Sequence, residues 1–462
     1  MAGEQTVQLR DVCVKIGSGA TPRGGKEAYK GGATSLIRSQ NIYNEGFHRD
    51  GLVYIDDDQS AELRNVEVKP NDVLLTITGD SVARCCQVAP DVLPARVNQH
   101  VAIIRPQPKS LDARFLRYVL VSHEYQSRLS ALASAGATRP ALTKSMIEEL
   151  DIPSPPLAEQ KAIAAVLGAL DDKIELNRRM NATLEAMARA LLQSWFVDFD
   201  PVRRNLDFTR SRGERGEEKK KFQPARSPLR ASASPRDHFA ALDPATAAIF
   251  LDSFQDSSLG SIPHGWEVCP LSEKIQLLSG GTPKTSEPTY WDGDIPWYSV
   301  RDAPSETDVW VIHTDKHVAK LGIANSAAQI FPEKTTIIIA RGTVGKLALT
   351  AVPMAMNQSC YGVRGITGYG DYFTYYSLRE ATAQLQQRTH GTVFDTITTE
   401  TFKTLDCIFP TPQITAAFDK LVEPLLGQIR ANLHQSRTLA TLRDTLLPKL
   451  LSGELSVASE KH

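Results

Sequence analysis

The sequence is poor in cysteine and has no Cys-x-x-Cys spacing. Six cysteines are scattered along 462 residues with no matching histidine pair, which excludes the usual zinc frameworks. The adjacent residues Cys85 and Cys86 cannot easily form a disulfide with each other without strain. We therefore predict buried, reduced thiols, no metal site and a cytoplasmic location.

Long apolar runs and a surplus of one charge are also missing. No stretch approaches the roughly 18 to 20 apolar residues that a membrane-spanning helix needs, so we expect a soluble, unsecreted protein with no membrane partner. Lys and Arg number 52 against 53 Asp and Glu. This balance gives no sign of nucleic-acid binding over the whole chain, so any contact with nucleic acid must be local.

Catalytic signatures are absent as well. Gly342–Lys346 approaches a phosphate-binding loop, but Ala340 occupies the place of its first glycine. Gly17–Gly19 begins like a dinucleotide fingerprint that Pro22 interrupts. Asp200–Val202 lacks the second proline and the aromatic ring of the methyltransferase motif, and no nucleophile elbow or zinc-protease motif is present. We predict a binding protein rather than an enzyme, with no catalytic residue.

What the chain does contain is an internal repeat with a period of about 260 residues. Each copy has a Gly-x-Thr-Pro turn with a tyrosine downstream, then an apolar strand and a glycine turn, and then a strand that opens on Asn-Gln. The aligned segments are Leu9–Gly32 with Leu271–Asp294, Lys69–Arg84 with Phe331–Lys346, and Val97–Arg105 with Met356–Arg364. We therefore expect two related domains.

Each copy ends in a predicted long helix. Seam positions recur at alternating steps of four and three from Ile163 to Trp195 and from Phe418 to Leu450, which is the period of a coiled coil. At 1.5 Å per residue each helix would be on the order of 55 Å long, and one apolar stripe of that length needs a partner. Two such helices in one chain pair most simply with each other, antiparallel, which would place the two domains at opposite ends of a rod.

Polar residues interrupt both seams at corresponding places, and we expect them to fix the register of the pairing. They are Asn177, Asn181, Asn432 and Ser436. The alternative is that these side chains face solvent.

Residues 201–260 differ in composition from the rest. Between 201 and 240 there are 11 Lys and Arg against 5 Asp and Glu, much serine and proline, and no apolar period. We predict a basic flexible linker with a short helix over Ala245–Phe254. Its positive charge could contact phosphate, but charge runs in linkers are more often simply solvated.

Together the repeats and helices resemble the DNA specificity subunit of type I restriction-modification systems. Beside the Gly-x-Thr-Pro turn, the motifs that carry the resemblance are Ser35–Ile42, Val97–His100, Ile152–Gln160, Trp195–Val202 and Leu447–Leu455. They cover nearly the whole chain outside the linker. The second helix departs from the family at Thr411–Ala416, where the family has Pro-Pro-Leu-x-Glu-Gln.

The resemblance implies an α+β fold, in which two repeated α/β target recognition domains are separated by a pair of long antiparallel coiled-coil helices. The expected boundaries are 1–156 and 261–411 for the domains, 157–199 and 412–455 for the spacer helices, and 200–260 for the linker with its short helix.

The resemblance also implies partners. Each domain would read one part of a bipartite site in double-stranded DNA, and the helices would bind two methyltransferase (modification) subunits, joined by restriction/translocase subunits. Those partners would use S-adenosylmethionine for DNA methylation at adenine, and ATP with Mg²⁺ for restriction. No cofactor is expected on this chain.

Base reading needs side chains that fork onto base edges: Arg or Lys for guanine, Asn or Gln for adenine. The candidates for DNA binding are Arg23, Lys26, Arg38, Gln40, Asn41, Arg84, Arg139, Lys144, Lys284, Thr285, Tyr298, Arg301, Arg341, Thr343 and Lys346. Many would contact phosphate only. The pairs Asn98-Gln99 and Asn357-Gln358 recur in both halves, so we expect them to satisfy backbone groups of the fold rather than to read bases.

Two other functions remain open on the sequence alone. One is a coiled-coil scaffold that binds only proteins, which would show no sequence-selective DNA binding even beside a methyltransferase. The other is a methyltransferase or nuclease with an unrecognised site, which would act as a purified single chain.

If the helices act as a ruler, their length should set the gap between the two half-sites. Inserting four residues, about one helical turn, should then change the preferred gap, as measured by mapping modified sites. An unchanged target after the insertion would count against the ruler.

Overall fold

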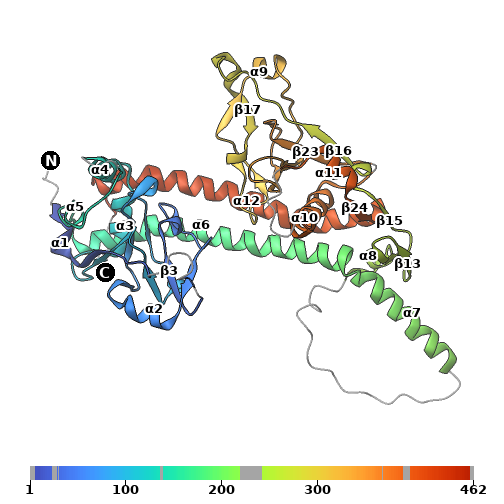
Figure 1. Cartoon of the computed structure of the whole chain (residues 1–462), viewed down its shortest axis with the longest axis horizontal. Coiled ribbons are helices and arrows are strands. Elements are labelled where there is room, and N and C mark those ends of the chain that lie inside the picture. The colour runs from blue at the N-terminus through green and yellow to red at the C-terminus, as the bar shows by residue number, and fades with distance from the viewer. Residues whose placement is uncertain are drawn as a thin grey trace. The chain divides into compact units, whose positions relative to one another are not determined.

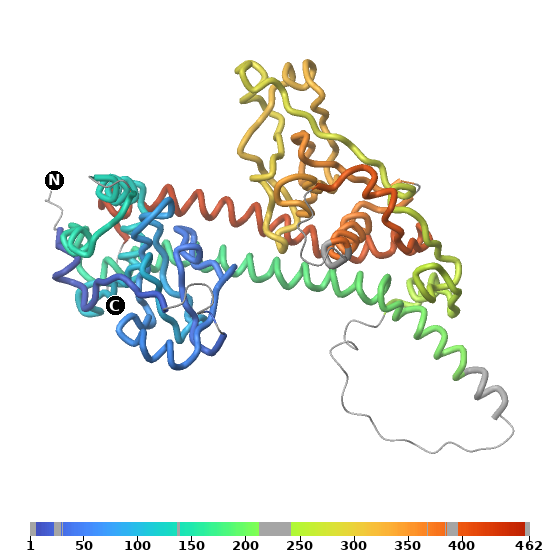
Figure 2. Tube along the Cα trace, in the orientation of Figure 1, coloured from blue at the N-terminus to red at the C-terminus, as the bar shows by residue number. Residues whose placement is uncertain are grey.

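The structure is a computed structural model that describes residues 6–22, 29, 31–135, 139–218, 242–366, 368–388 and 396–457. The chain divides into two compact units, one formed by Met1–Ile174 with Thr438–His462 and the other by Glu175–Arg437. Each unit holds one α/β domain and parts of both long helices, and the course of the chain within each unit can be followed in Figures 1 and 2. None of the described helices is long and apolar enough to span a membrane.

The two long helices begin and end close to their predicted limits. They are α6, Leu157–Leu192, and α12, Pro412–Leu451. In the second unit Asn177 bonds to Ser436 while Asn181 bonds to Asn432, so the two helices run antiparallel there, as predicted.

The polar seam residues of the second unit face the partner helix. Asn177, Asn181 and Asn432 are 0%, 2% and 4% exposed, which excludes the solvent-facing alternative for these three. Asn177 Nδ2 donates to Ser436 Oγ at 3.1 Å, and Asn432 Nδ2 donates to Asn181 Oδ1 at 2.9 Å. A slipped pairing would leave these amides unsatisfied, so their role in fixing the register stays our prediction.

The first domain contains two four-stranded sheets. The antiparallel sheet has the order β2 (Cys13–Ser18), β11 (Val101–Pro106), β8 (Val73–Thr76), β9 (Cys85–Gln87). The mixed sheet has the order β6 (Val53–Ile55), β3 (Thr34–Ile37), β10 (Ala95–Val97), β7 (Glu67–Val68). In the mixed sheet β3 is parallel to β10. A third pairing joins β1 (Thr6–Gln8) to β12 (Asp151–Pro153). The short strands β4 (Ile42–Tyr43) and β5 (Gly46–Phe47) form a hairpin.

The second domain repeats this plan, which confirms the internal duplication. Its antiparallel core has the order β16 (Ile275–Ser279), β23 (Cys360–Gly365), β20 (Thr336–Ile339), β21 (Leu347–Thr350), to which β18 (Trp310–Val311) adds in parallel. The second sheet has the order β19 (Lys316–Val318), β17 (Trp291–Tyr298), β22 (Ala355–Met356), and β15 (Glu267–Pro270) pairs with β24 (Asp406–Phe409). The parallel pair β17 and β22 corresponds to β3 and β10.

Helices cover the sheets in both domains. They are α1 (Leu9–Val12), α2 (Asp57–Glu62), α3 (Ala113–Val121), α4 (His123–Ser134) and α5 (Lys144–Glu148) in the first domain, and α9 (Lys320–Ala324), α10 (Asp371–Arg388) and α11 (Thr399–Thr404) in the second. No disulfide joins the cysteines, as predicted, but only Cys85, Cys86 and Cys360 are buried and the other three are half-buried. Burial raises the pKa of Cys86 and of Cys360 to about 12.

The departure at the start of the second long helix has a structural counterpart. In the first unit the buried Gln160 of α6 accepts a hydrogen bond from Asp112 N at 2.9 Å, just before α3. In the second unit Asp419 of α12 accepts from Tyr372 N at 3.2 Å and Phe373 N at 2.8 Å, at the start of α10. Gln160 and Asp419 both accept hydrogen bonds from N–H groups that have no partner inside the helix at its start. In α12 this role therefore belongs to Asp419, a residue outside the segment that departs from the family. Burial raises the pKa of Asp419 to about 6.

The prediction of a flexible linker over 200–260 is wrong for its two ends. Helix α7 covers Asp200–Glu218, and β13 (Phe254–Ser257) pairs with β14 (Gly260–Pro263) in a hairpin. The short helix predicted over Ala245–Phe254 is present as α8, but it covers only Pro244–Ala247, and Phe254 belongs to β13. Phe199 and Val202 are buried where α7 begins. So few apolar positions do not form a periodic pattern from which a helix could be predicted. Residues 219–241 lie outside the described residues.

Candidate nucleic-acid interface

Four loop segments of the first domain meet at one edge of its sheets. Asn98 N donates to Ile37 O at 3.0 Å, Ile77 N to His100 O at 2.9 Å, and Leu142 N to Ile77 O at 2.8 Å. These bonds join the end of β3, the β8–β9 turn, the β10–β11 turn and the segment before α5. We name residues 38–41, 78–84, 98–100 and 139–143 the recognition edge of the first domain.

The second domain has the same edge, held by the same bonds. Asn357 N donates to Tyr298 O at 2.9 Å, Ala340 N to Ser359 O at 2.8 Å, and Ile397 N to Ala340 O at 2.9 Å. The recognition edge of this domain consists of residues 299–302, 341–346, 357–359 and 396–398. The duplication therefore places corresponding residues of the two domains in corresponding surroundings.

A short 3-10 turn opens each recognition edge. In the first domain Arg38 N donates to Asn41 Oδ1 at 3.1 Å, and Asn41 Nδ2 donates to His48 O at 3.0 Å and Asp50 O at 3.1 Å. Asn41 is 0% exposed, so its predicted contact with bases is wrong: its amide serves the loop itself. The side chain of Gln40, one residue earlier, is exposed.

The turn of the second domain is closed in the same way, because Ser299 N donates to Asp302 Oδ2 at 2.7 Å. The middle residue Arg301 is exposed and makes no side-chain hydrogen bond or ion pair with the described residues. Tyr298, just before the turn, is 0% exposed and its hydroxyl has no partner in the described part of the chain. The prediction that Tyr298 contacts bases is therefore wrong, because its ring belongs to the core.

The β-turns of the two edges each end in a cation. Thr76 N donates to Arg84 O at 2.8 Å, and Ile339 N donates to Lys346 O at 2.9 Å, so Arg84 and Lys346 correspond. The Arg84 guanidinium lies 4.6 Å from the centroid of the Tyr43 ring, which orients it. Lys346 is exposed.

The other predicted residues are placed as follows. Arg341 and Thr343 are exposed in the second recognition edge, Arg139 is exposed in the first, and Lys144 lies just after it and pairs with Glu148 at 3.3 Å. Arg38 is half-buried and Nη2 donates to Gly51 O at 2.5 Å. Lys284 and Thr285 are exposed in the loop before β17, away from the defined edges in sequence. Arg23 and Lys26 lie outside the described residues.

The repeated Asn-Gln pair divides into two roles. Asn98 Oδ1 accepts from His100 N at 3.1 Å, and Asn357 Oδ1 accepts from Ser359 N at 3.1 Å, so the prediction that the pair satisfies the fold is confirmed for asparagine. Gln99 is exposed, as is Gln358, whose Oε1 accepts a bond from the Thr282 hydroxyl. Sequence reasoning therefore missed an exposed glutamine in each edge, and the signal was its recurrence.

The Gly-x-Thr-Pro turn lies against these edges. A Cβ on Gly19 would come within 2.1 Å of Val97 O, and a Cβ on Gly280 within 2.0 Å of Asn357 O. Only glycine allows that approach of two backbones. The glycine that corresponds to Gly19 is therefore Gly280, and not Gly281, which stands opposite Gly19 when Leu9–Gly32 is aligned with Leu271–Asp294 without a gap.

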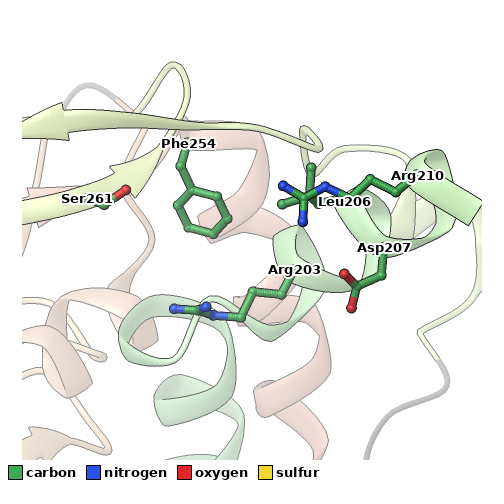
Figure 3. A pocket seen from close by; sticks show the side chains of 6 residues that line it. All are labelled: Arg203, Leu206, Asp207, Arg210, Phe254 and Ser261. Carbon is green, nitrogen blue, oxygen red and sulfur yellow. The ribbon is translucent and has the colours of Figure 1, made fainter.

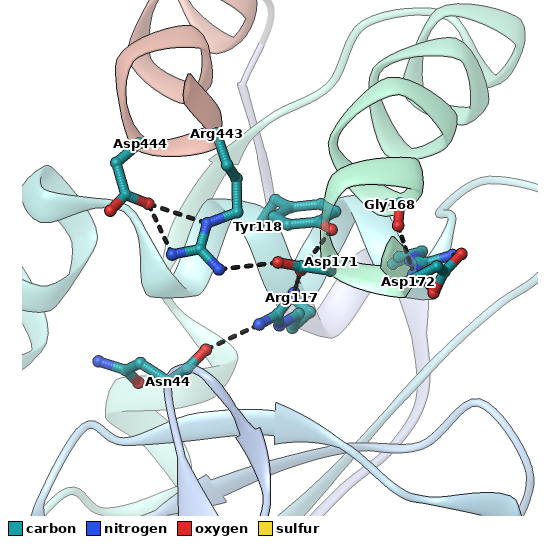
Figure 4. Close-up of polar contacts among 9 residues, drawn as sticks. Asn44, Arg117, Tyr118, Gly168, Asp171, Asp172, Arg443 and Asp444 are labelled. Atoms are coloured by element: carbon teal, nitrogen blue, oxygen red, sulfur yellow. Dashed lines mark hydrogen bonds and ion pairs between the residues drawn. The ribbon is translucent and has the colours of Figure 1, made fainter. Parts of the chain in front are cut away.

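The first unit also contains a largely buried charge network (Figure 4). Asp171 of α6 pairs with Arg117 of α3 and accepts from Tyr118 Oη at 2.7 Å and from Arg443 Nη1 of α12 at 2.7 Å. Arg117 Nη2 donates in turn to Asn44 O at 2.7 Å. Burial opposes the ionisation of Asp171, but its partners outweigh burial and hold the pKa of this carboxyl below its usual value. The network joins the domain to both long helices within this unit.

A second feature is a pocket of about 400 Å³ between α7 and the β13–β14 hairpin (Figure 3). It is lined by Arg203, Leu206, Asp207, Arg210, Phe254 and Ser261. The Arg203 guanidinium lies 5.4 Å from the centroid of the Phe254 ring. Among the described residues, no group of three or more His, Cys, Asp or Glu side chains could hold a metal ion.

Comparison with known proteins places this architecture. The type I restriction modification DNA specificity domain matches residues 1–186 and 263–433. The chain is 27% identical over 84% of its length to the type I restriction enzyme HindI specificity subunit of Haemophilus influenzae, covering 87% of that protein. It is 24% identical over 96% of its length to the MjaIX specificity subunit of Methanocaldococcus jannaschii, covering 91% of that protein.

A solved structure shares the fold. The S subunit of a type I restriction-modification system from M. genitalium aligns with a TM-score of 0.50 and 16% identity, over 96% of this chain and 95% of that one. Because the matched family domain covers most of the sequence in two copies, the chain belongs to the type I restriction-modification DNA specificity family.

Proposed function

We propose that this chain is a non-catalytic specificity subunit that binds double-stranded DNA through two recognition edges, each facing one half of a bipartite target. The observation that carries the proposal is the duplication of the edge: the same backbone bonds present exposed side chains of the base-reading and phosphate-binding types in both domains. Its family membership supports the same function.

The near-zero net charge of the chain is consistent with a protein that binds DNA together with partner subunits. A lone DNA-binding protein usually carries a basic excess to neutralise phosphates, whereas this chain has a formal net charge of −1. We propose that methyltransferase subunits bind along α6 and α12 and supply the remaining contacts, and that S-adenosylmethionine, ATP and Mg²⁺ belong to modification and restriction partners. A scaffold without DNA specificity is the competing function.

The proposal is tested by co-expressing the chain with the methyltransferase encoded beside it and mapping modified positions across the genome. We expect a split motif with a fixed gap. Modification without any sequence motif would favour the scaffold. Modification by the purified chain alone would show that the chain has a catalytic site, which would contradict the proposal.

We predict that Arg84→Ala and Lys346→Ala each weaken DNA binding without changing the recognised sequence. These cations hold corresponding places in the two edges, as expected for contacts with phosphate, which every sequence offers. Each variant of the methyltransferase complex should reduce the slope of log affinity against log salt by about 1. Lys109→Ala is the control, because this exposed lysine follows the end of β11 that is opposite to the recognition edge, and it should leave the slope within error. A changed motif for either cation variant would contradict the assignment.

A further inference from the structure

We infer that Gln40 and Arg301 are corresponding base-reading residues, and that each determines one base pair of its own half-site. This inference rests on the proposed function and deepens it. It assigns base reading to one position of the repeat, which Gln40 occupies in the first recognition edge and Arg301 in the second.

The two residues occupy the same place in the repeat. Each follows a strand whose last carbonyl accepts a hydrogen bond from the asparagine of the Asn-Gln pair, at 3.0 Å in one domain and 2.9 Å in the other. Each precedes the residue that closes the 3-10 turn, Asn41 or Asp302, which accepts the N–H three residues back. Because the residues before and after them correspond in the two domains, Gln40 and Arg301 correspond as well. Both side chains are exposed.

The amide of Gln40 is held in an orientation suited to adenine. Its Nε2 donates to Gly51 O at 3.2 Å, which uses one of its two N–H groups. One N–H and Oε1 remain, and this is the pair that adenine meets with its N7 acceptor and its N6 amino donor in the major groove. A Cβ on Gly51 would lie 2.3 Å from Gln40 Nε2, so the glycine makes room for this arrangement.

Arg301 offers a different recognition group from the same position. Its guanidinium makes no hydrogen bond or ion pair with the described residues, so its fork of N–H donors is available. That fork matches the O6 and N7 acceptors of guanine, and a lysine, which is a point charge, does not reproduce it.

The other matched positions of the two edges make a useful contrast. Gln99 and Gln358 are identical, and Arg84 and Lys346 carry the same charge. Groups that are alike in both domains suit what both half-sites share, which is the sugar-phosphate backbone. The inferred pair differs in kind between the domains, as two readers of different half-sites must.

The test exchanges the two side chains in the full chain, co-expressed with its methyltransferase partner, and maps modified positions. Arg301→Gln should change one position of one half-site from guanine toward adenine, and should lower modification of the original sequence by about 5- to 150-fold. Gln40→Arg should produce the reverse change at one position of the other half-site. Arg301→Lys should relax the same position that Arg301→Gln changes.

Gln99→Ala and Gln358→Ala are the matched controls, because they are exposed in the same edges; they should reduce modification without altering the motif. For a variant that loses modification, binding of its complex to duplexes changed one base pair at a time gives the same information. An unchanged motif, or the wild-type ranking of duplexes, in both exchange variants would overturn the inference while the wild-type split motif still upheld the proposed function. A wild-type chain without any motif would overturn both.

Discussion

Replacing Asp171 with alanine should destabilise the first unit by about 3–5 kcal/mol, because it leaves the buried Arg117 without its counter-charge. Arg443 loses one of its two carboxylate partners and keeps Asp444, at 2.8 Å. The side chains of Arg117 and Arg443 are 8% and 16% exposed, and both pair with this one carboxylate. Tyr118 also loses its hydrogen-bond acceptor. Hydrogen exchange of the amides of α3 and of the sheet beside it measures the loss as a local free energy of opening.

The neighbouring residue provides a matched control on the same helix. Asp172 pairs with Arg114, but its side chain is 67% exposed, so Asp172→Ala should cost only about 0–1 kcal/mol. Equal losses in the two variants would show that the buried network does not stabilise the unit.

The effect of Asp171 should also depend on pH. Its pKa is lowered from the usual 3.8 in the folded state, so its contribution is fully present above that value and is lost as pH falls through the folded pKa. The stability difference between the wild type and Asp171→Asn should therefore be constant near neutral pH and shrink in acid. A difference that grows as pH falls would show that burial, rather than the arginines, dominates this carboxyl.

The long helices and the repeat could be predicted from the sequence because both are long patterns. The alternation of four and three extends over several heptads in each helix, and each repeat supplies several matching segments, so one deviant residue does not hide the pattern. Helix α7 escaped prediction because its anchors are a few residues such as Phe199 and Val202, packed against distant parts of the chain. Tertiary contacts of that kind leave no periodic signal.

The site residues were harder to predict because residue type does not tell which way a side chain points. Asn41 and Gln40 are neighbours of similar chemistry, yet the first turns inward to close the loop and the second faces outward. Tyr298 is of a type that often contacts DNA, but at the end of β17 it is 0% exposed. These outcomes depend on single-residue register at the end of a strand, which only the backbone hydrogen bonds reveal.

The motif Trp195–Val202, which follows α6, contributes to the packing of the second unit. Trp195 is 2% exposed, and its ring meets the Phe250 ring at 5.0 Å and the Phe418 ring at 6.1 Å between centroids. It therefore packs α12 and the segment after α8 against the end of α6. Trp195→Ala should cost about 3–5 kcal/mol, from lost burial and the cavity left behind. Val197→Ala, at a position that is 40% exposed, should change stability by less than about 0.5 kcal/mol.

Trp195→Ala and Asp171→Ala together test whether the two units unfold separately. Among the described residues, the buried cluster that contains Trp195 and the cluster that contains Leu167 and Leu447, in the unit of Asp171, have no member in common. We therefore expect each variant to lose exchange protection only in its own unit. Helix α6 contributes residues to both units, so its amides on either side of Ile174 should respond to different variants. Loss of protection in both units from either single change would mean that the helices transmit stability along their length and that the chain unfolds as one.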